Sequence, residues 1–242
     1  MFRNHGQGAG ADNPDASGAL AAAATGAARS KRVKPYFDDG HGIQIFLGDC
    51  REILPTLPKV DLVLTDPPYG IGARMQGGTW ATRGGIYDAM QDWDLKPVDN
   101  ATLAMVIDWG KQAIIWGGNY YSLPPMRCWL AWMKIDNMGP NGTMADFELA
   151  WTNIDFVSKS FNEIRNPDGK HCHPTQKPIS LMKWCLNFRG IPKTMLDPFC
   201  GSGSSLVAAK LQGISATGIE ISERFCELAA NRLRQSVLNF EG

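Results

Sequence analysis

Short apolar runs alternate with helical patterns along most of the chain after its first residues. Seven of these runs are predicted to be strands: Ile43–Leu47, Val60–Thr65, Ala113–Trp116, Trp129–Met133, Glu148–Thr152, Thr194–Leu196 and Ser215–Ile219. The interleaved segments have helical periodicity. Strands and helices in alternation are typical of an α/β domain whose sheet is parallel or mostly parallel.

Helical periodicity is clearest in three segments of the C-terminal part. The first begins near Pro178, which suits a first helical turn, and its apolar face holds Ile179, Met182, Cys185 and Leu186. The second covers residues 206–211 and runs toward Gly213, a predicted C-cap. The third begins at Ser222, a predicted N-cap, and its apolar stripe is Phe225, Leu228, Ala229 and Leu233. Residues 70–112 are Gly-rich and weakly periodic, so an irregular segment is predicted there.

Composition limits this pattern to one domain with a tail. A chain of 242 residues can bury one sizeable core. Residues 1–33 hold almost no large apolar side chains, so we expect a disordered tail ahead of one domain at 34–242. The basic residues that end this tail fit a solvated linker, or an arm that touches phosphate.

Charge and cysteine content narrow the class of protein further. The formal net charge is zero, so any contact with nucleic acid has to come from a local patch. The six cysteines form no Cys-x-x-Cys pair, which favours a reduced, cytoplasmic chain with buried thiols. No apolar run is long enough to span a bilayer, and the N-terminus does not resemble a signal peptide. His171-Cys172-His173 is a poor metal site because residues this close in sequence rarely converge, so no metal is expected.

Candidate chemistry begins where the apolar run Val60–Thr65 ends, at Asp66-Pro67-Pro68-Tyr69. Open α/β sheets place their ligands at the carboxyl ends of strands. The two prolines stiffen the backbone and leave carbonyl oxygens without an adjacent N–H group. The tetrapeptide therefore offers a carboxylate, neutral acceptors and an aromatic face, which together suit a flat heteroaromatic amine.

A second stretch, residues 197–205, joins a predicted strand to a helix through a Gly-x-Gly turn. Its glycines let a ligand approach the backbone closely. Glu220 ends the next strand, where an acidic side chain binds ribose hydroxyls in nucleotide folds. Leu206 replaces the third glycine of the dinucleotide pattern, which favours a nucleoside without phosphates. The alternative is a tight structural turn beside a solvated glutamate. Cys200, in this turn, has no obvious base partner and is more simply a small turn residue than a nucleophile.

Two further polar stretches follow strands or precede helices. Gly48-Asp49-Cys50 closes the first predicted strand, where a carboxylate can accept from an adenine amino group or simply form a turn. The loop His173-Pro174-Thr175-Gln176-Lys177-Pro178 leads into a helix. Residues 157–193 hold seven Lys/Arg against two Asp/Glu, an excess that either faces phosphates or is ordinary solvated surface.

Together these four stretches resemble the motifs of the amino-group DNA methyltransferases, which use S-adenosylmethionine. The family's catalytic motif, Asp-Pro-Pro-Tyr, stands at 66–69, and its cofactor motif, Asp-Pro-Phe-x-Gly-Ser-Gly, stands at 197–203. Its His-Pro-Thr-Gln-Lys-Pro loop stands at 173–178, and Gly218-Ile219-Glu220-Ile221 is similar to its ribose-binding strand. The catalytic motif precedes the cofactor motif, an order that resembles the circularly permuted beta group. Ser204-Ser205 replaces two threonines common in the family, and the hydroxyls remain.

The resemblance, which covers roughly residues 40–235, implies a fold and a set of roles. The fold would be a single Rossmann-like class I methyltransferase domain, with a seven-stranded, mostly parallel sheet, helices on both faces, and target-recognition insertions at about 71–110 and 120–170. The cofactor would be cradled by the turn residues Phe199, Gly201, Ser202, Gly203, Ser204 and Ser205. Its methionine end would be held by Asp197 and the loop residues His173, Thr175, Gln176 and Lys177. Its ribose hydroxyls would bind Glu220 beside Ile221, and its adenine end would lie at Asp49 and Cys50.

The resemblance also implies a mechanism. Asp66 and the Pro67 carbonyl would accept the two N–H groups of an exocyclic amine, which localises the nitrogen lone pair for direct attack on the sulfonium methyl. The base would flip out of the duplex, with Tyr69 stacking on it and Pro68 stiffening the motif. In the family, Asp at the first motif position goes mostly with adenine N6 and Ser mostly with cytosine N4, so adenine is expected and cytosine is the alternative.

Duplex DNA is thus the expected partner, and a homodimer is expected because the insertions are short for reading a long site alone. Candidate DNA contacts within them are Arg74, Arg83, Lys134, Lys159 and Arg165, with Trp80 and Trp93 able to wedge or pack. Three other classes compete: a protein glutamine methyltransferase, which would carry Asn at position 66, a non-catalytic DNA- or cofactor-binding subunit, and a dehydrogenase. The incomplete phosphate turn disfavours the last.

Overall fold

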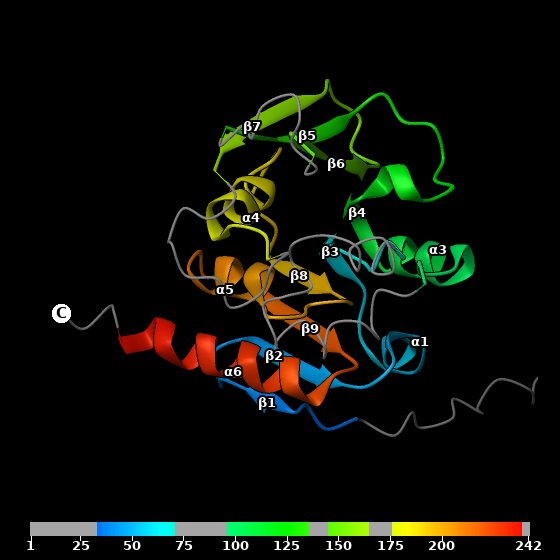
Figure 1. The fold of residues 1–242 in the computed structure, drawn as a ribbon. Helices are drawn as coiled ribbons and strands as arrows, with labels where there is room; N and C mark the ends of the chain where they lie inside the picture. Colours follow the sequence, from blue (N-terminus) through cyan, green and yellow to red (C-terminus); the bar gives the residue numbers. More distant parts are fainter. Residues whose placement is uncertain (1–32, 71–95, 136–144, 165–175, 239–242) are drawn as a thin grey trace, which may run out of the picture. The chain divides into compact units, whose positions relative to one another are not determined.

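A computed structural model describes residues 33–70, 96–135, 145–164 and 176–238. Nine strands in these ranges form one sheet with the order β1-β2-β9-β8-β3-β4-β6-β5-β7 (Figure 1). The strands are β1 Phe37–Asp38, β2 Ile43–Leu47, β3 Val60–Thr65, β4 Gly110–Trp116, β5 Trp129–Lys134, β6 Phe147–Thr152, β7 Lys159–Glu163, β8 Thr194–Asp197 and β9 Ser215–Glu220. The helices are α1 Cys50–Ile53, η1 Leu54–Thr56, α3 Asn100–Asp108, η3 Gly118–Tyr120, α4 Ile179–Leu186, α5 Ser204–Lys210 and α6 Glu223–Leu238.

The middle of the sheet is parallel: β2, β9, β8, β3 and β4 pair in that order with the same direction. β6 runs antiparallel to β4 and β5, β7 is parallel to β5, and β1 is antiparallel to β2. Because the central strands are parallel, their carboxyl ends meet at one edge of the sheet. The predicted mostly parallel α/β sheet is confirmed.

Helices cover both faces, and this explains the continuous apolar run of β3. Leu62 and Leu64 pack in one cluster with the buried sides of α4, α5 and α6, whereas Val63 packs in a second cluster with α1 and α3. α6 buries Cys226, Ala229, Ala230 and Leu233, a stripe that overlaps the predicted one. Gly213 adopts a left-handed φ of 68° after α5, as its predicted capping role requires.

The predicted strand count of seven was wrong because the sheet has two further edge strands. β1 has only two residues, too few to show a pattern. β7 reads Lys-Ser-Phe-Asn-Glu and is exposed or half-buried along its length, so it lacks the apolar run that identifies a core strand.

The prediction of an irregular segment at 70–112 was also wrong in its last part, where α3 and the start of β4 lie. Asp99 caps α3 by accepting a hydrogen bond from the Thr102 N–H at 2.9 Å, and Leu103 and Val106 are buried beneath the helix. In the region 120–170, the described residues contribute β5, β6 and β7 to the sheet. None of the helices in the described ranges has the length and apolarity needed to span a membrane.

Candidate functional site

A cavity of about 620 Å³ opens at the carboxyl ends of β2, β3, β8 and β9. Its volume lies in the range of pockets that bind small molecules. All four polar stretches singled out in the sequence reach it. The predicted site residues that line it are Asp49, Cys50, Asp66, Pro68, Gln176, Lys177, Asp197, Phe199, Gly201, Ser202, Ser204, Ser205, Glu220 and Ile221.

Five predicted site residues are not among the residues that line this cavity. Pro67 and Tyr69 lie in the catalytic stretch but outside the lining, and so does Gly203. His173 and Thr175 lie outside the residues that the structure describes.

The Asp197 carboxylate ties the cofactor-type turn to the neighbouring strand. It is buried and accepts hydrogen bonds from the Thr65 hydroxyl at 2.7 Å, the Phe199 N–H at 3.1 Å and the Ser205 hydroxyl. Burial raises the pKa of Asp197 to about 6, although these hydrogen bonds favour its ionised form. Asp197 therefore shapes the turn, and any contact with a ligand would add to these bonds.

The two glycines of the turn have different surroundings. Both have left-handed backbones, with φ of 48° at Gly201 and 79° at Gly203. A Cβ at Gly201 would meet no atom within 4 Å, and this residue lines the cavity. A Cβ at Gly203 would lie 2.8 Å from the Ala229 Cβ of α6. The missing side chain of Gly203 therefore lets α5 begin against α6, and the predicted contact of Gly203 with a cofactor stays a prediction.

Glu220 ends β9 at the cavity wall. Its two carboxylate oxygens accept from the Gly201 N–H at 2.9 Å and the Ser222 N–H at 2.8 Å. Burial raises the pKa of Glu220, whereas these backbone hydrogen bonds lower it. Each oxygen has a second lone pair, so the carboxylate can still accept from ligand hydroxyls.

Asp49 lines the cavity and caps α1. It accepts from the Arg51 N–H at 2.8 Å and pairs with the Arg51 guanidinium at 2.5 Å. The Arg51 hydrogen bond lowers the pKa of Asp49. Arg51 also lines the cavity, and the sequence reasoning missed it.

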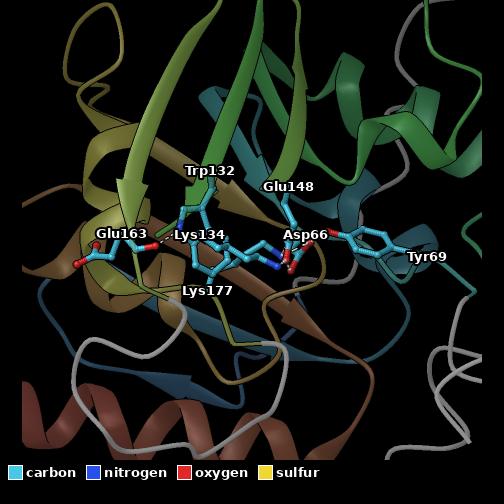
Figure 2. A network of polar contacts seen from close by, with 7 residues as sticks. All are labelled: Asp66, Tyr69, Trp132, Lys134, Glu148, Glu163 and Lys177. Carbon is cyan, nitrogen blue, oxygen red and sulfur yellow. Dashed lines mark hydrogen bonds and ion pairs between the residues drawn. The ribbon is translucent and has the colours of Figure 1, made fainter. Parts of the chain in front are cut away.

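Asp66 lies immediately after β3 and is the first member of a chain of alternating charges (Figure 2). Its Oδ2 accepts from the Lys177 Nζ at 2.5 Å, and the Lys177 Nζ also lies 3.0 Å from Glu148 of β6. Glu148 in turn pairs at 2.5 Å with Lys134 of β5. Lys177 is buried, so its ammonium is shared between two carboxylates with little solvent around it. We call Asp66, Lys177, Glu148 and Lys134 the charge chain.

The pKa directions in the charge chain follow from this geometry. Burial disfavours the Lys177 ammonium, but Asp66 and Glu148 outweigh it and raise the pKa of Lys177 above its ordinary value. Burial would raise the pKa of Glu148, but Lys177 and Lys134 lower it to about 2. The pKa of Asp66 is raised, by burial first, against the attraction of Lys177 and with the repulsion of Glu148. Asp66 is therefore the more basic carboxylate of the two.

The charge chain corrects one prediction and adds one residue. Lys134 is 8% exposed and pairs inside the protein, so its predicted contact with DNA is wrong. Glu148 was missed as a site residue, because it lies within a stretch that reads as a plain core strand. Lys159 is exposed on β7, as a DNA contact requires. The other candidates lie outside the described residues: Arg74, Trp80, Arg83, Trp93 and Arg165.

Tyr69 turns its hydroxyl, not its ring face, toward Asp66. The hydroxyl donates to Asp66 Oδ1. The ring stacks on Tyr120, with centroids 4.9 Å apart and planes 16° apart. Gly117 leaves room for this ring, since a Cβ there would come within 2.0 Å of it. A base that stacks on the same face of Tyr69 would have to displace Tyr120, which is half exposed.

Cys200 is buried, and burial raises the pKa of its thiol well above the ordinary value. Its sulfur packs under β9, where a Cβ at Gly218 would lie 2.8 Å from it. A thiol held protonated in this way is a poor nucleophile, as the interpretation as a turn residue requires. In the described ranges, no group of three His, Cys, Asp or Glu side chains is arranged to bind a metal.

Comparison with known proteins identifies relatives of this chain. A family model described as DNA methylase matches residues 115–231. The type II methyltransferase M.ScaI of Streptomyces caespitosus is 26% identical over 260 residues, which cover 83% of this chain and 84% of that protein. The putative methylase YubD of Escherichia coli K12 is 29% identical over 219 residues, which cover 77% and 88%. The cytosine-N4-specific PvuII DNA methyltransferase has the same fold with a TM-score of 0.53 at 11% identity, over 83% of this chain and 92% of that one.

Proposed function

We propose that this chain, which belongs to the amino-group DNA methyltransferases, transfers a methyl group from S-adenosylmethionine to N6 of an adenine flipped out of duplex DNA. The observation that carries the proposal is the position of Asp66. Its carboxylate lies on the wall of the cavity, fixed by Lys177 and Tyr69, at the carboxyl end of the central strand β3.

The residues of the cavity fit S-adenosylmethionine, a nucleoside without phosphates. Gly201 opens the turn toward the ligand, and Glu220 offers carboxylate oxygens to ribose hydroxyls. Asp49 and Cys50 are proposed to bind the adenine, and Gln176 and the turn serines the methionine end; all of them line the cavity. When bound, the cofactor supplies an electrophilic methyl group on a sulfonium.

Asp66 performs the step that the target amine needs. The nitrogen lone pair of an exocyclic amine is delocalised into the ring, which makes the amine a poor nucleophile. Asp66 and the Pro67 carbonyl accept its N–H hydrogens, which draws the nitrogen toward tetrahedral geometry and stabilises the positive charge that develops on it. The raised pKa of Asp66 strengthens it as an acceptor and as the first site for the proton that the methylated nitrogen loses.

Adenine is proposed over cytosine because position 66 is Asp, which goes mostly with adenine in the family that the chain resembles. Cytosine N4 is the second candidate, and the cytosine-specific relative shares the fold. Mass spectrometry of nucleosides from methylated DNA decides between them: N6-methyladenine supports the proposal, and N4-methylcytosine alone overturns it.

We propose that the enzyme acts as a homodimer in the bacterial or phage-infected cytoplasm, as a lone modification enzyme or beside a restriction partner. Light scattering with and without DNA tests the assembly. A monomeric mass at micromolar concentration in the DNA complex would count against a dimer.

The decisive experiment incubates the protein with labelled S-adenosylmethionine and separate DNA, RNA and protein acceptors. We expect label in DNA alone. Asp66→Asn should lower the rate by about 100-fold or more, the scale for loss of one preorganised polar group. Asp108→Asn is the matched control, because Asp108 is exposed and, within the described ranges, its ion pair is with the Lys59 side chain at the surface. Label in protein, or an Asp66→Asn enzyme as active as the control, would refute the proposal.

A further inference from the structure

We infer that Glu148 is a positioning residue for the methyl transfer: it shares the Lys177 ammonium with Asp66, so that the charge of Asp66 is only partly compensated and can still attract the amine. The inference rests on the proposed function, because it concerns the same carboxylate. Glu148 lies on β6, and the motifs that identify the site do not include it.

The contacts of Lys177 carry the argument. Its ammonium donates to Asp66 Oδ2 at 2.5 Å and, more weakly, to the Tyr69 hydroxyl at 3.4 Å, and it forms an ion pair with Glu148 Oε2 at 3.0 Å. The ammonium is buried, so water cannot share its charge. If Glu148 were neutral, the whole charge of Lys177 would fall on Asp66. Asp66 would then be a closed ion pair with less attraction left for an amine N–H.

The charges of the chain also sum to zero, with Asp66 and Glu148 negative and Lys177 and Lys134 positive. Removal of the Glu148 charge would leave a net charge of +1 beside a cavity that is proposed to receive a sulfonium cation. A unit charge several Å away in a partly buried site changes affinity for a cation by about tenfold. S-adenosylhomocysteine has no charge at sulfur, so its binding should change much less.

Ionisable groups on the neighbouring elements face Asp66, and each of them can contribute to the pH dependence of the reaction. They are Tyr69 on its own loop, Lys177 before α4, Glu148 on β6 and Asp197 at the end of β8. The pKa values of Tyr69 and Lys177 lie above their ordinary values. Of these four groups, Asp197 has a pKa raised to about 6, mainly by its own burial. The acidic limb of the pH profile is the fall of kcat/KM at low pH. A change at Glu148 that shifts this limb therefore reports on Asp66.

The test compares Glu148→Gln with Glu163→Gln. Glu163 lies on β7, where it pairs with Lys134 in the strand register, but its carboxylate accepts from the Ser180 hydroxyl and is not part of the charge chain. In Glu148→Gln, we expect the ratio of S-adenosylmethionine affinity to S-adenosylhomocysteine affinity, measured by calorimetry, to fall by about tenfold. We also expect the acidic limb of its kcat/KM profile to move to lower pH. Glu163→Gln should change neither quantity.

Lys134→Met provides an opposite perturbation if Glu148→Gln does not fold. It leaves the chain with a net negative charge and strengthens the pull of Glu148 on Lys177, so the affinity ratio should rise and the acidic limb should move to higher pH. Unchanged ratios and limbs in both variants would overturn the inference, and so would shifts in the same direction. A wild-type protein that methylates no DNA would overturn the proposed function instead, which keeps the two failures distinct.

Discussion

The two glycines of the Gly201-Ser202-Gly203 turn should fail in different ways when each is replaced by Ala. Both occupy left-handed backbones, where a Cβ costs about 1–2 kcal/mol. At Gly203 the Cβ also lies 2.8 Å from the Ala229 Cβ, and neither atom belongs to a flexible side chain that can swing away. Overpacking of this kind costs about 1–3 kcal/mol more.

Gly203→Ala should therefore lower the free energy of unfolding by roughly 2–5 kcal/mol. One kcal/mol shifts the Tm of a domain of this size by about 2–4 °C, so the variant should melt roughly 4–20 °C below wild type. Gly201→Ala meets no atom and should lose only about 1–2 kcal/mol from its backbone. Its new methyl group instead projects into the cavity where the cofactor is proposed to lie.

Urea unfolding and calorimetric titration with S-adenosylmethionine separate the two effects. We expect Gly203→Ala to be unstable but to bind once folded at low temperature, and Gly201→Ala to be nearly as stable as wild type but to bind at least about tenfold more weakly. A stable Gly203→Ala would refute the packing argument. Normal binding by Gly201→Ala would refute the placement of the ligand against this turn.

Three further outcomes are expected from the other side of the site. Lys177→Met leaves the half-buried Asp66 and Glu148 without their shared cation, so it should lower the free energy of unfolding in urea by about 1–3 kcal/mol, and an undiminished stability would contradict the ion-pair geometry. Gly117→Ala brings a Cβ within 2.0 Å of the Tyr69 ring and should lower kcat more than DNA affinity, measured in steady-state methylation and filter binding. The folded pKa of Glu148, about 2, lies below its ordinary value of 4.5, so its stabilisation is present above pH 4.5 and is lost as pH falls toward 2. Acid unfolding of Glu148→Gln should lack that component, and an acid profile identical to wild type would exclude it.

The fold could be predicted wherever strands are buried on both faces. β2 and β3 match their predicted bounds because their apolar runs end sharply at Gly48 and Asp66. β7 could not be predicted, because an edge strand needs no apolar run and Phe161 alone packs inward. α3 was missed although its capping residue, Asp99, was visible in the sequence, since weak periodicity around it suggested a loop.

The site residues that could be predicted are those at the carboxyl ends of strands. Parallel strands bring their carboxyl ends together, so Asp49, Asp66, Asp197 and Glu220 converge although they are far apart in sequence. The charge chain could not be derived this way. The pairing of Lys134 with Glu148 depends on the antiparallel register of β5 and β6, which no local pattern reveals.

The charge chain also explains how a carboxylate with two partners can still accept a third. Asp66 uses one oxygen for Lys177 and the other for Tyr69, and each oxygen has a second lone pair. These partners come from different segments, so the carboxylate is oriented before an amine arrives and does not reorganise during the reaction. An ammonium bound to Asp66 alone would fix the carboxylate equally well but would neutralise it. Glu148 makes both effects possible: Lys177 still donates to Asp66, while Glu148 compensates part of the charge of the Lys177 ammonium.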